Sequence, residues 1–542
     1  MSSSIPHTYD AILALILFLV SNVAVIIPFR LPIHRICVKT ARRWLVHLRV
    51  LPASAKPPRR IHIHGNYITV PLLSVLLLLA TKSINGAIIR RGILGADGVE
   101  PLSILALFLS LAYISISLDF TGLFRFSAFW VARRGGNSGP KLYFFLYIFF
   151  LICGILVGND PVILCGTPFL AYLTRVSGIT PPTAWLFSQF AAANMASVVL
   201  ISSNPTNLVL TGAFSISFIS YTAHVILPFL AAAICVYPVL TLGLFRSTRL
   251  IPSSLNLNFG DDENESALVD RQGAIFGSAL MLITLAVLAG TSTIGVPVWQ
   301  VTVPAGLVML LRDMYHDWSY NRTLNSQRQA STPSIHELQD TSTPTTSPTP
   351  STPEKSDISS FTRMHIKVVS DRYPTVSAIL SRLPVPVLPF AFLMFILIQG
   401  LSTKGWIELF AVWWSAWAQR TGVLGVVGGM GFISCILCNF CGTNIGATIL
   451  LARIIQLWSS TNTVDPRARD GAIYALALGS NFGAFTLTLS ASLAGLLWRG
   501  ILHQKGIHVR AKQFLLLNLP ISFVAMLVGC GVLVAEVYII HR

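Results

Sequence analysis

Polar residues interrupt long apolar runs at places where a membrane-spanning helix could not expose them to lipid. The first interruption, residues 158–161, reads Gly-Asn-Asp-Pro and separates the apolar run 143–157 from another that ends at residue 173. Because Pro161 removes a helix hydrogen bond and Gly158 permits a turn, we expect two half-helices that meet at a tip. A carboxylate at mid-membrane depth is by default a proton or cation site, which makes Asp160 the first candidate.

Two further interruptions follow the same logic. Residues 438–444 read Cys-Asn-Phe-Cys-Gly-Thr-Asn between apolar runs and predict a second hairpin tip. Residues 202–207 read Ser-Ser-Asn-Pro-Thr-Asn, and we expect them to line a cavity beside the first tip, since facing lipid would be costly. Residues 486–492 carry hydroxyls at alternate positions. An unbroken helix, in which these hydroxyls bond carbonyls four residues earlier, remains as plausible there as a second break.

Backbone N–H and C=O groups at such breaks have no helical partner, so ions and oxyanions can satisfy them. We therefore expect the breaks and nearby polar side chains to form one site for a small solute and an ion. The candidate residues are Asn159, Asp160, Asn194, Ser203, Asn204, Thr206, Asn207, Thr443, Asn444, Asn481, Thr488 and Ser490.

Three cysteines, Cys435, Cys438 and Cys441, recur every third residue and would share one helical face. Three thiols could capture arsenite or a soft metal ion. A zinc site usually needs a fourth ligand, and the surrounding sequence offers no histidine for it. Small apolar packing is therefore the favoured interpretation, with a metal site as the weaker alternative.

Two stretches share one plan, which is how repeats in transporters appear in sequence. The first stretch has Gly122, Asn159, Asn194 and Ser203, and the second has Gly405, Asn444, Asn481 and Ser490, at nearly equal spacings. Five crossings lie between corresponding points. Because five is odd, we expect the second unit to be inverted in the membrane.

Composition indicates one large membrane domain. The chain has 542 residues with a mean hydropathy of +0.68 and 11% charged residues, against about 25% in soluble proteins. About 10–12 transmembrane segments are expected, and the candidates are 11–29, 67–81, 101–118, 184–212, 221–245, 272–291, 295–311, 385–400, 470–490 and 514–539. The net charge of +17 fits basic loops beside lipid, so no nucleic-acid partner is expected.

Charge and composition also divide the chain. Nine Lys and Arg residues and no acidic residue lie between 30 and 65, which predicts a cytoplasmic loop and an N-terminus on the other side. Residues 341–350 are almost entirely Ser, Thr and Pro, which predicts a disordered linker. The expected regions are an N-terminal transmembrane helix and basic loop (1–66), a first membrane repeat with connecting helices (67–311), the cytoplasmic linker (312–383) and a second, inverted repeat (384–542).

At these residues the sequence resembles the ion-transporter superfamily of arsenite permeases, citrate transporters and sodium/dicarboxylate cotransporters. The resemblance is carried by Leu118-Asp119 with residues 122–126, by Asn159-Asp160-Pro161 with Thr167-Pro168, by residues 203–207, and by residues 479–483 with 487–490. It implies an all-α fold of two inverted repeats, each with a re-entrant hairpin and a broken helix. It also implies that the tips and unwound helices bind a coupling ion and an anion, and that a homodimer is possible.

The resulting hypothesis is secondary active transport of a small anion or oxyanion (arsenite, citrate or another carboxylate), coupled to H⁺ or Na⁺. A Na⁺/H⁺ antiporter of the same fold remains open. No P-loop is present, and we expect no cofactor beyond the coupling ion. An intramembrane aspartyl protease would need Asp119 and Asp160 within about 3 Å of each other, so an enzyme is not expected. The chain length and the Ser/Thr/Pro linker suggest a eukaryotic protein, so we expect it in the plasma membrane or a vacuolar membrane.

Overall fold

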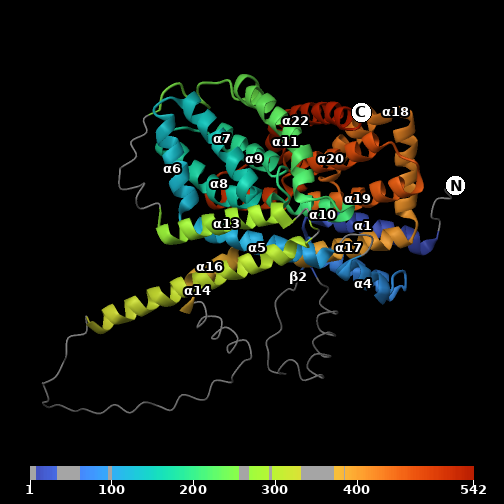
Figure 1. Ribbon diagram of the computed structural model, residues 1–542, viewed down its shortest axis with the longest axis horizontal. Helices are drawn as coiled ribbons and strands as arrows, with labels where there is room; N and C mark the ends of the chain where they lie inside the picture. Colours follow the sequence, from blue (N-terminus) through green and yellow to red (C-terminus); the bar gives the residue numbers. More distant parts are fainter. Residues whose placement is uncertain are drawn as a thin grey trace, which may run out of the picture.

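The computed structural model is almost entirely helical over the residues that it describes (Figure 1). These residues are 8–32, 62–95, 100–255, 268–291, 294, 296–330, 372–383 and 385–542. Within them, seven helices are long and apolar enough to cross a membrane, and two shorter apolar helices accompany them. The expected class of a polytopic, all-α membrane protein is confirmed.

The N-terminal part lies against the second half of the chain. It comprises α1 (Tyr9–Ile26), the antiparallel strands β1 (Phe29–Pro32) and β2 (His62–Gly65), α3 (Thr69–Ala80) and α4 (Gly86–Leu94). Helix α1 contacts both α3 and α17 (Val387–Thr403), and the Ser21 hydroxyl donates a hydrogen bond to the Ser74 hydroxyl at 2.9 Å. Most of the expected basic loop lies outside the described residues.

The first repeat begins with a tight turn. Its elements are α5 (Pro101–Phe120), α6 (Leu123–Gly135), α7 (Gly139–Val157), α8 (Asn159–Val176), α9 (Thr183–Ala196), η1 (Ile201–Ser203), α10 (Pro205–Phe214), α11 (Phe218–Pro238) and the π-helical η2 (Val239–Leu244). Gly122 joins α5 to α6 at φ +85°, a backbone conformation that glycine adopts without steric cost. Figure 1 shows α6, α7, α8 and α9 gathered at one end of the molecule.

The second repeat has the same order of elements after α17. These are α18 (Trp406–Leu437), α19 (Asn444–Thr461), α20 (Pro466–Phe482), η4 (Gly483–Phe485), η5 (Leu489–Ala491), α21 (Leu493–Gln504) and α22 (Ala511–Ile540). Gly405 matches Gly122 with φ +84°, and Gly422 at φ +62° divides α18 where a loop separates α6 from α7. The order of elements supports a repeat, whereas the inverted orientation stays a prediction.

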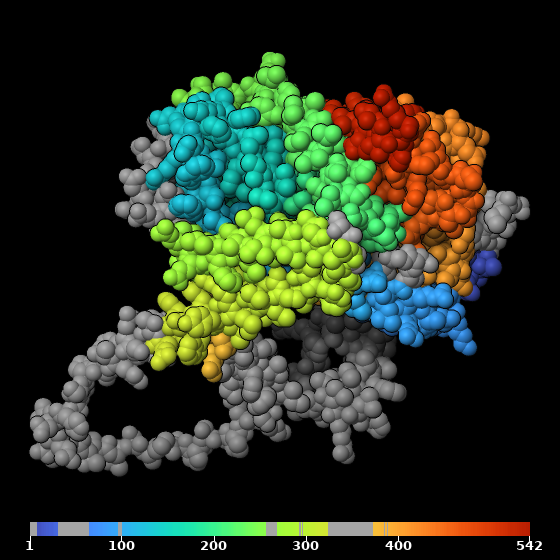
Figure 2. All heavy atoms as spheres, in the orientation of Figure 1, coloured from blue at the N-terminus to red at the C-terminus, as the bar shows by residue number. Residues whose placement is uncertain are grey.

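Connecting helices join the repeats along one face of the molecule. Helices α13 (Arg271–Thr291) and α14 (Val298–Ala330) lie side by side in Figure 2, and α16 (Pro374–Arg382) packs on α14. Helix α14 is longer than the expected span 295–311. Both α14 and α16 occupy parts of the range 312–383 that was expected to be linker, and the segment between them lies outside the described residues.

Two expected spans are wrong as continuous helices. Span 184–212 ends as a helix at Ala196 and resumes at Pro205, and span 470–490 ends at Phe482. The alternative of an unbroken helix through 486–492 is also wrong, because Thr488 and Ser492 have extended backbone conformations around a single 3₁₀ turn. Both repeats therefore contain a broken helix.

An aromatic cluster packs the two repeats together. The Phe190 ring of α9 stacks on the Trp498 ring of α21 with a centroid distance of 4.6 Å, and Phe514 of α22 contacts both. All three side chains are fully buried. Such contacts contribute about 0.5–1.5 kcal/mol per pair beyond the area that they bury, so this cluster helps to fix the broken helices against each other.

Candidate functional site

Asn481 of α20 joins the broken helices of the two repeats. Its Oδ1 accepts hydrogen bonds from Asn204 Nδ2 at 2.8 Å and from Ser197 Oγ at 3.0 Å, and its Nδ2 donates to Asn207 Oδ1 at 2.7 Å. Asn207 Nδ2 in turn donates to the Ser197 and Leu200 carbonyls where α9 stops. We call Ser197, Asn204, Asn207 and Asn481 the central amide network; all four are buried.

The first hairpin lies beside this network. Gly158 separates α7 from α8 at φ +94° and ψ 169°, a region open essentially only to glycine. A Cβ at this position would lie 2.7 Å from the Ser203 carbonyl oxygen, so the hairpin tip and the broken helix touch. Asn159 Nδ2 donates to Asn194 Oδ1 at 3.1 Å, and Ser203 Oγ donates to the Ile155 carbonyl at 2.5 Å.

Asn439 organises the break in the second repeat. Its Oδ1 accepts hydrogen bonds from the Thr488 amide at 2.9 Å and the Thr488 hydroxyl at 3.1 Å, and its Nδ2 donates to Thr486 Oγ1 at 2.8 Å. Ser490 Oγ donates to Thr488 Oγ1 at 3.2 Å. Sequence analysis placed Asn439 in the second polar interruption but did not include it among the candidate site residues, although its amide at that position could have identified it.

A cavity of about 290 Å³, which we call the inner cavity, lies where the first hairpin meets the first broken helix. Its polar lining comprises Tyr67, Ser115, Gly158, Asn159, Asp160, Ser202, Ser203 and Arg382, and its apolar lining includes Leu493, Leu496 and Leu497 of α21. Helices α8 and α10 both begin at its wall, with Asn159 and Pro205. Helix N-termini carry a partial positive charge and attract anions.

Asp160 stands in the first turn of α8 and faces this cavity. Within the described residues, its carboxylate has no hydrogen-bond or ion-pair partner. A carboxylate near a helix N-terminus is favourably placed, and this one is free to take a proton or a cation.

The structure brings most of the predicted site residues together, in four groups. The inner cavity is lined by Asn159, Asp160 and Ser203. The central amide network includes Asn204, Asn207 and Asn481 and adjoins Asn194, whereas Asn439 is bound to Thr488, which also accepts a hydrogen bond from Ser490. The fourth group is buried at the starts of α10 and α19 and comprises Thr206, Thr443 and Asn444. The last group lies outside the lining of the inner cavity.

Unsatisfied oxygen atoms mark both repeats. Ser202 Oγ lies at the first break, and Thr443 Oγ1 lies at the second hairpin tip; both are buried without a partner among the described residues. Asn22 Oδ1 of α1 is also unpartnered, and a Cβ added to Gly442 would lie 2.9 Å from it. Because a buried polar atom without a partner is costly, such atoms are candidates for ligands of an ion.

The three cysteines do not form a metal-binding group. The described residues contain no cluster of three or more His, Cys, Asp or Glu side chains able to hold a metal ion. Cys438 Sγ instead lies 3.7 Å from the Ser480 carbonyl oxygen, and a Cβ at Gly483 would be 2.7 Å from this sulfur. The described geometry gives the weaker alternative of a soft-metal site no support, and Cys438 packs against α20 and η4.

Asp119 and Asp160 face different surroundings. Arg382 Nη1 donates to Asp119 Oδ2 at 3.1 Å, and in the described part of the chain no hydrogen bond joins the two carboxylates. The acid pair that an aspartyl protease would need is not assembled.

Two family models match the chain, one in each half. The citrate transporter family CitMHS matches residues 59–323, and the arsenical pump membrane protein family ArsB matches residues 360–535. The two models and the apolar helices support an integral membrane protein, and the families point to a transporter of anions or oxyanions. Together the two models support the resemblance to the ion-transporter superfamily that the sequence shows.

Curated relatives agree with this assignment. Arsenical pump membrane proteins of Yersinia enterocolitica and Escherichia coli strain K12 are 24% and 23% identical over 429 residues, with 78% of this chain and 84% of each relative covered. The crystal structure of the Alcanivorax borkumensis YdaH transporter aligns over 98% of this chain and 99% of its own, with a TM-score of 0.48 and 14% identity. Both values are low, so this structural similarity supports no further conclusion.

Proposed function

We propose that the protein is a secondary active transporter of a small anion or oxyanion of the arsenite, citrate or carboxylate class, coupled to H⁺ or Na⁺. The observation that carries this proposal is the inner cavity, where two interrupted helices face one space with a carboxylate that has no partner among the residues described by the structure. No element that hydrolyses a nucleotide is recognisable in the sequence, so an ion gradient is the energy source that we expect.

The wall of the inner cavity suits an anion. The N-termini of α8 and α10 and the guanidinium of Arg382 provide positive potential, and Ser115, Ser202 and Ser203 offer hydroxyl donors. One side of the cavity is apolar, because it is formed by Leu493, Leu496 and Leu497. These side chains exclude water and so strengthen the electrostatic contacts. Together they favour a compact solute that carries negative charge or several oxygen atoms.

Asp160 supplies the coupling in this proposal. An anion would be repelled by an ionised carboxylate in the same cavity, so binding of the anion requires a proton or a Na⁺ ion at Asp160. Thr443 and Asn444 at the second tip, with Asn22, are candidates for a second ion site because two of their oxygen atoms lack a partner within the described residues.

Transport by purified protein in proteoliposomes tests the proposal. Uptake of arsenite, citrate and other carboxylates is measured under an imposed H⁺ or Na⁺ gradient, for the wild type, Asp160→Asn and the exposed control Glu100→Gln. We expect gradient-driven uptake that falls at least tenfold in Asp160→Asn and is unchanged in Glu100→Gln. Uptake without gradient dependence would reject coupling, and Na⁺/H⁺ exchange without anion flux would favour the antiporter.

The location and the oligomeric state belong to the same proposal. We expect the plasma membrane or a vacuolar membrane, and a homodimer as the family resemblance implies. Fluorescent tagging in cells and light scattering of the detergent-purified protein measure these two properties. A fluorescent signal confined to another organelle would reject the first, and a monomeric mass would reject the second.

A further inference from the structure

A second cavity, of about 470 Å³, adjoins the inner cavity; we call it the outer cavity. Leu164 and Arg382 line both cavities, so only these two side chains are shared between the two walls. The remaining lining of the outer cavity comes from the end of α5, from Gly122 and α6, from the middle of α8, from Val269 before α13 and from the residue after α21. Arg382 therefore stands between the two adjacent cavities.

The outer cavity is cationic. Its lining includes Arg125 of α6, Arg382 of α16 and Lys505 after α21, against one carboxylate, that of Asp119. In the part of the chain that the structure describes, Asp119 is ion-paired to Arg382, whereas Arg125 and Lys505 have no ion pair. Two exposed cations thus remain available to a solute in this space.

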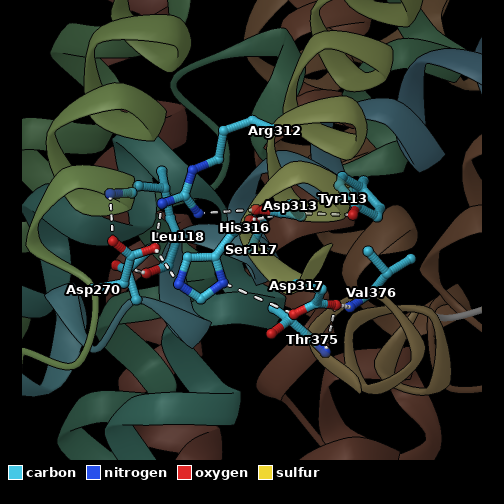
Figure 3. A network of polar contacts seen from close by, with 12 residues as sticks. Tyr113, Ser117, Leu118, Asp270, Arg312, Asp313, His316, Asp317, Thr375 and Val376 are labelled. Atoms are coloured by element: carbon cyan, nitrogen blue, oxygen red, sulfur yellow. Dashed lines mark hydrogen bonds and ion pairs between the residues drawn. The ribbon is translucent and has the colours of Figure 1, made fainter. Parts of the chain in front are cut away.

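Arg382 is held in place from both ends of its helix. Its guanidinium contacts Asp119 Oδ2 at 3.1 Å and lies over the Phe120 ring, with Cζ 4.2 Å from the ring centroid. The start of α16 is fixed by Asp317 of α14, whose Oδ2 accepts hydrogen bonds from the Thr375 and Val376 amides at 2.9 and 3.2 Å (Figure 3). Because the Arg382 side chain is 45% exposed, its ion pair is open to competition by another anion.

The second repeat has a cavity of about 360 Å³ in the corresponding place, but its charge differs. Ser402 stands three residues before Gly405, as Asp119 stands before Gly122, and Glu408 occupies the position of Arg125. Glu408 and Arg453 there give one charge of each sign. The excess of cations is therefore confined to the outer cavity and is not a consequence of the shared architecture.

We propose that the outer cavity is a loading site, which binds a small oxyanion or carboxylate before it enters the inner cavity. Arg125 and Lys505 attract the anion, and Arg382 exchanges the Asp119 carboxylate for it and passes it to the inner cavity. This inference rests on the proposed function, because the anion is the transported solute. Asp119 is then a competitor that keeps Arg382 occupied when no solute is present.

Kinetics of the double variant Arg125→Gln, Lys505→Gln test the loading site. A matched control, Arg134→Gln with Lys512→Gln, removes the same charge from α6 and from the first turn of α22 at residues that do not line the cavity. At low ionic strength we expect the KM for uptake of citrate, which is negatively charged at neutral pH, to rise at least fivefold in the first variant, with an unchanged maximal rate. The difference should shrink at high salt, because screening weakens the attraction in the wild type. Equal KM values in the test and control variants would overturn the proposal.

Asp119→Asn provides a test in the opposite direction. Removal of the competing charge frees Arg382, so we expect the KM to fall about threefold, a change that loss of a merely structural contact would not produce. A raised or unchanged KM contradicts the exchange step.

A binding measurement separates this inference from the proposed function. If the wild type takes up no anion, the proposed function fails. Stabilisation of the wild type by citrate or arsenate, measured as a rise in Tm, then decides the loading site. We expect a rise that the Arg125→Gln, Lys505→Gln variant loses and the control retains; no rise, or the same rise in both variants, rejects the site.

Discussion

Asn481 of the second repeat accepts a hydrogen bond from Asn204 of the first repeat at 2.8 Å, in the interior of the protein. Asn204 also caps α10, since its Oδ1 accepts from the Thr206 amide at 3.2 Å. One amide therefore fixes the end of a broken helix in one half and the contact with the other half. If the two repeats move relative to each other, either the hydrogen bond between Asn204 and Asn481 breaks or the two residues move together.

Asn481→Ala should impair both stability and transport. The substitution removes the short hydrogen bonds of Asn204 Nδ2 and Asn207 Oδ1, which costs about 1–3 kcal/mol for each group, whereas Ser197 Oγ keeps its bond to the Asn194 carbonyl. We expect a lower Tm and at least tenfold slower uptake in proteoliposomes. Asn462→Ala serves as the control, because that amide bonds only within or next to its own helix end. A Tm equal to that of the wild type would show that the network is dispensable.

Gly158→Ala should lower transport and Tm more than Gly136→Ala, a substitution at another glycine with a positive φ. Gly158 and Gly136 both have positive φ values, of +94° and +59°. A Cβ at Gly158 meets the Ser203 carbonyl at 2.7 Å, whereas a Cβ at Gly136 meets nothing within 4 Å. Strain alone costs about 1–3 kcal/mol in each variant. We expect Gly136→Ala to retain transport and Gly158→Ala to lose it, as measured by uptake and Tm; equal losses would refute a special role for the tip.

Asn518→Leu should stabilise the protein. Asn518 of α22 is fully buried, and neither its Nδ2 nor its Oδ1 has a partner among the described residues. Replacing an unsatisfied amide with an apolar group of similar size removes a desolvation cost, so we expect a gain of about 1 kcal/mol and a higher Tm. Asn439→Leu is the matched control with the opposite expected sign, because it breaks the hydrogen bonds to Thr486 and Thr488. A lower Tm for Asn518→Leu would point to a partner that the amide needs.

Asp270 should make stability depend on acid pH. Burial raises the pKa of the Asp270 carboxyl, but the Gly273 amide and the Arg312 guanidinium outweigh burial and hold the pKa below its ordinary value of 3.8. A carboxyl whose pKa is lowered on folding contributes stability that is complete above its ordinary pKa and is lost as the pH falls through the lowered value.

Thermal unfolding of the wild type and of Asp270→Asn, measured between pH 7 and pH 3, checks this expectation. The Asp270→Asn protein should have the lower Tm at pH 7, and the two curves should converge toward pH 3. Parallel curves would show that the contacts of Asp270 with Gly273 and Arg312 contribute no stability that depends on its charge.

Much of the site could be predicted because its residues conflict with their surroundings. Gly158 and the run from Ser202 to Asn207 stand out in apolar sequence, and the structure has breaks at both. The break at Thr488 could not be predicted with the same certainty, since the stretch contains no proline or adjacent glycine. Its extended backbone is held by Asn439, which is distant in sequence, and such tertiary contacts leave no local pattern.

Other features were missed for related reasons. Arg382 lies in a range that was expected to be linker, because the composition of residues 341–350 was extended to its flanks. The continuation of α14 to Ala330 is polar in sequence and shows no apolar periodicity that would predict it. The sequence favoured packing for Cys435, Cys438 and Cys441 but could not show what they pack against; the Cys438 sulfur lies where only a glycine, Gly483, leaves room for it.

Asp317 anchors the first amides of α16 to α14, so the first described helix after residues 331–371 packs along the last described helix before them. Helix α16 also contacts α5, so non-covalent contacts hold the start of the second half against the first. Continuity of the chain from 331 to 371 is then not what keeps the halves together. An ancestor encoded as two separate polypeptides, or a present-day protein nicked between them, could assemble through the same surfaces.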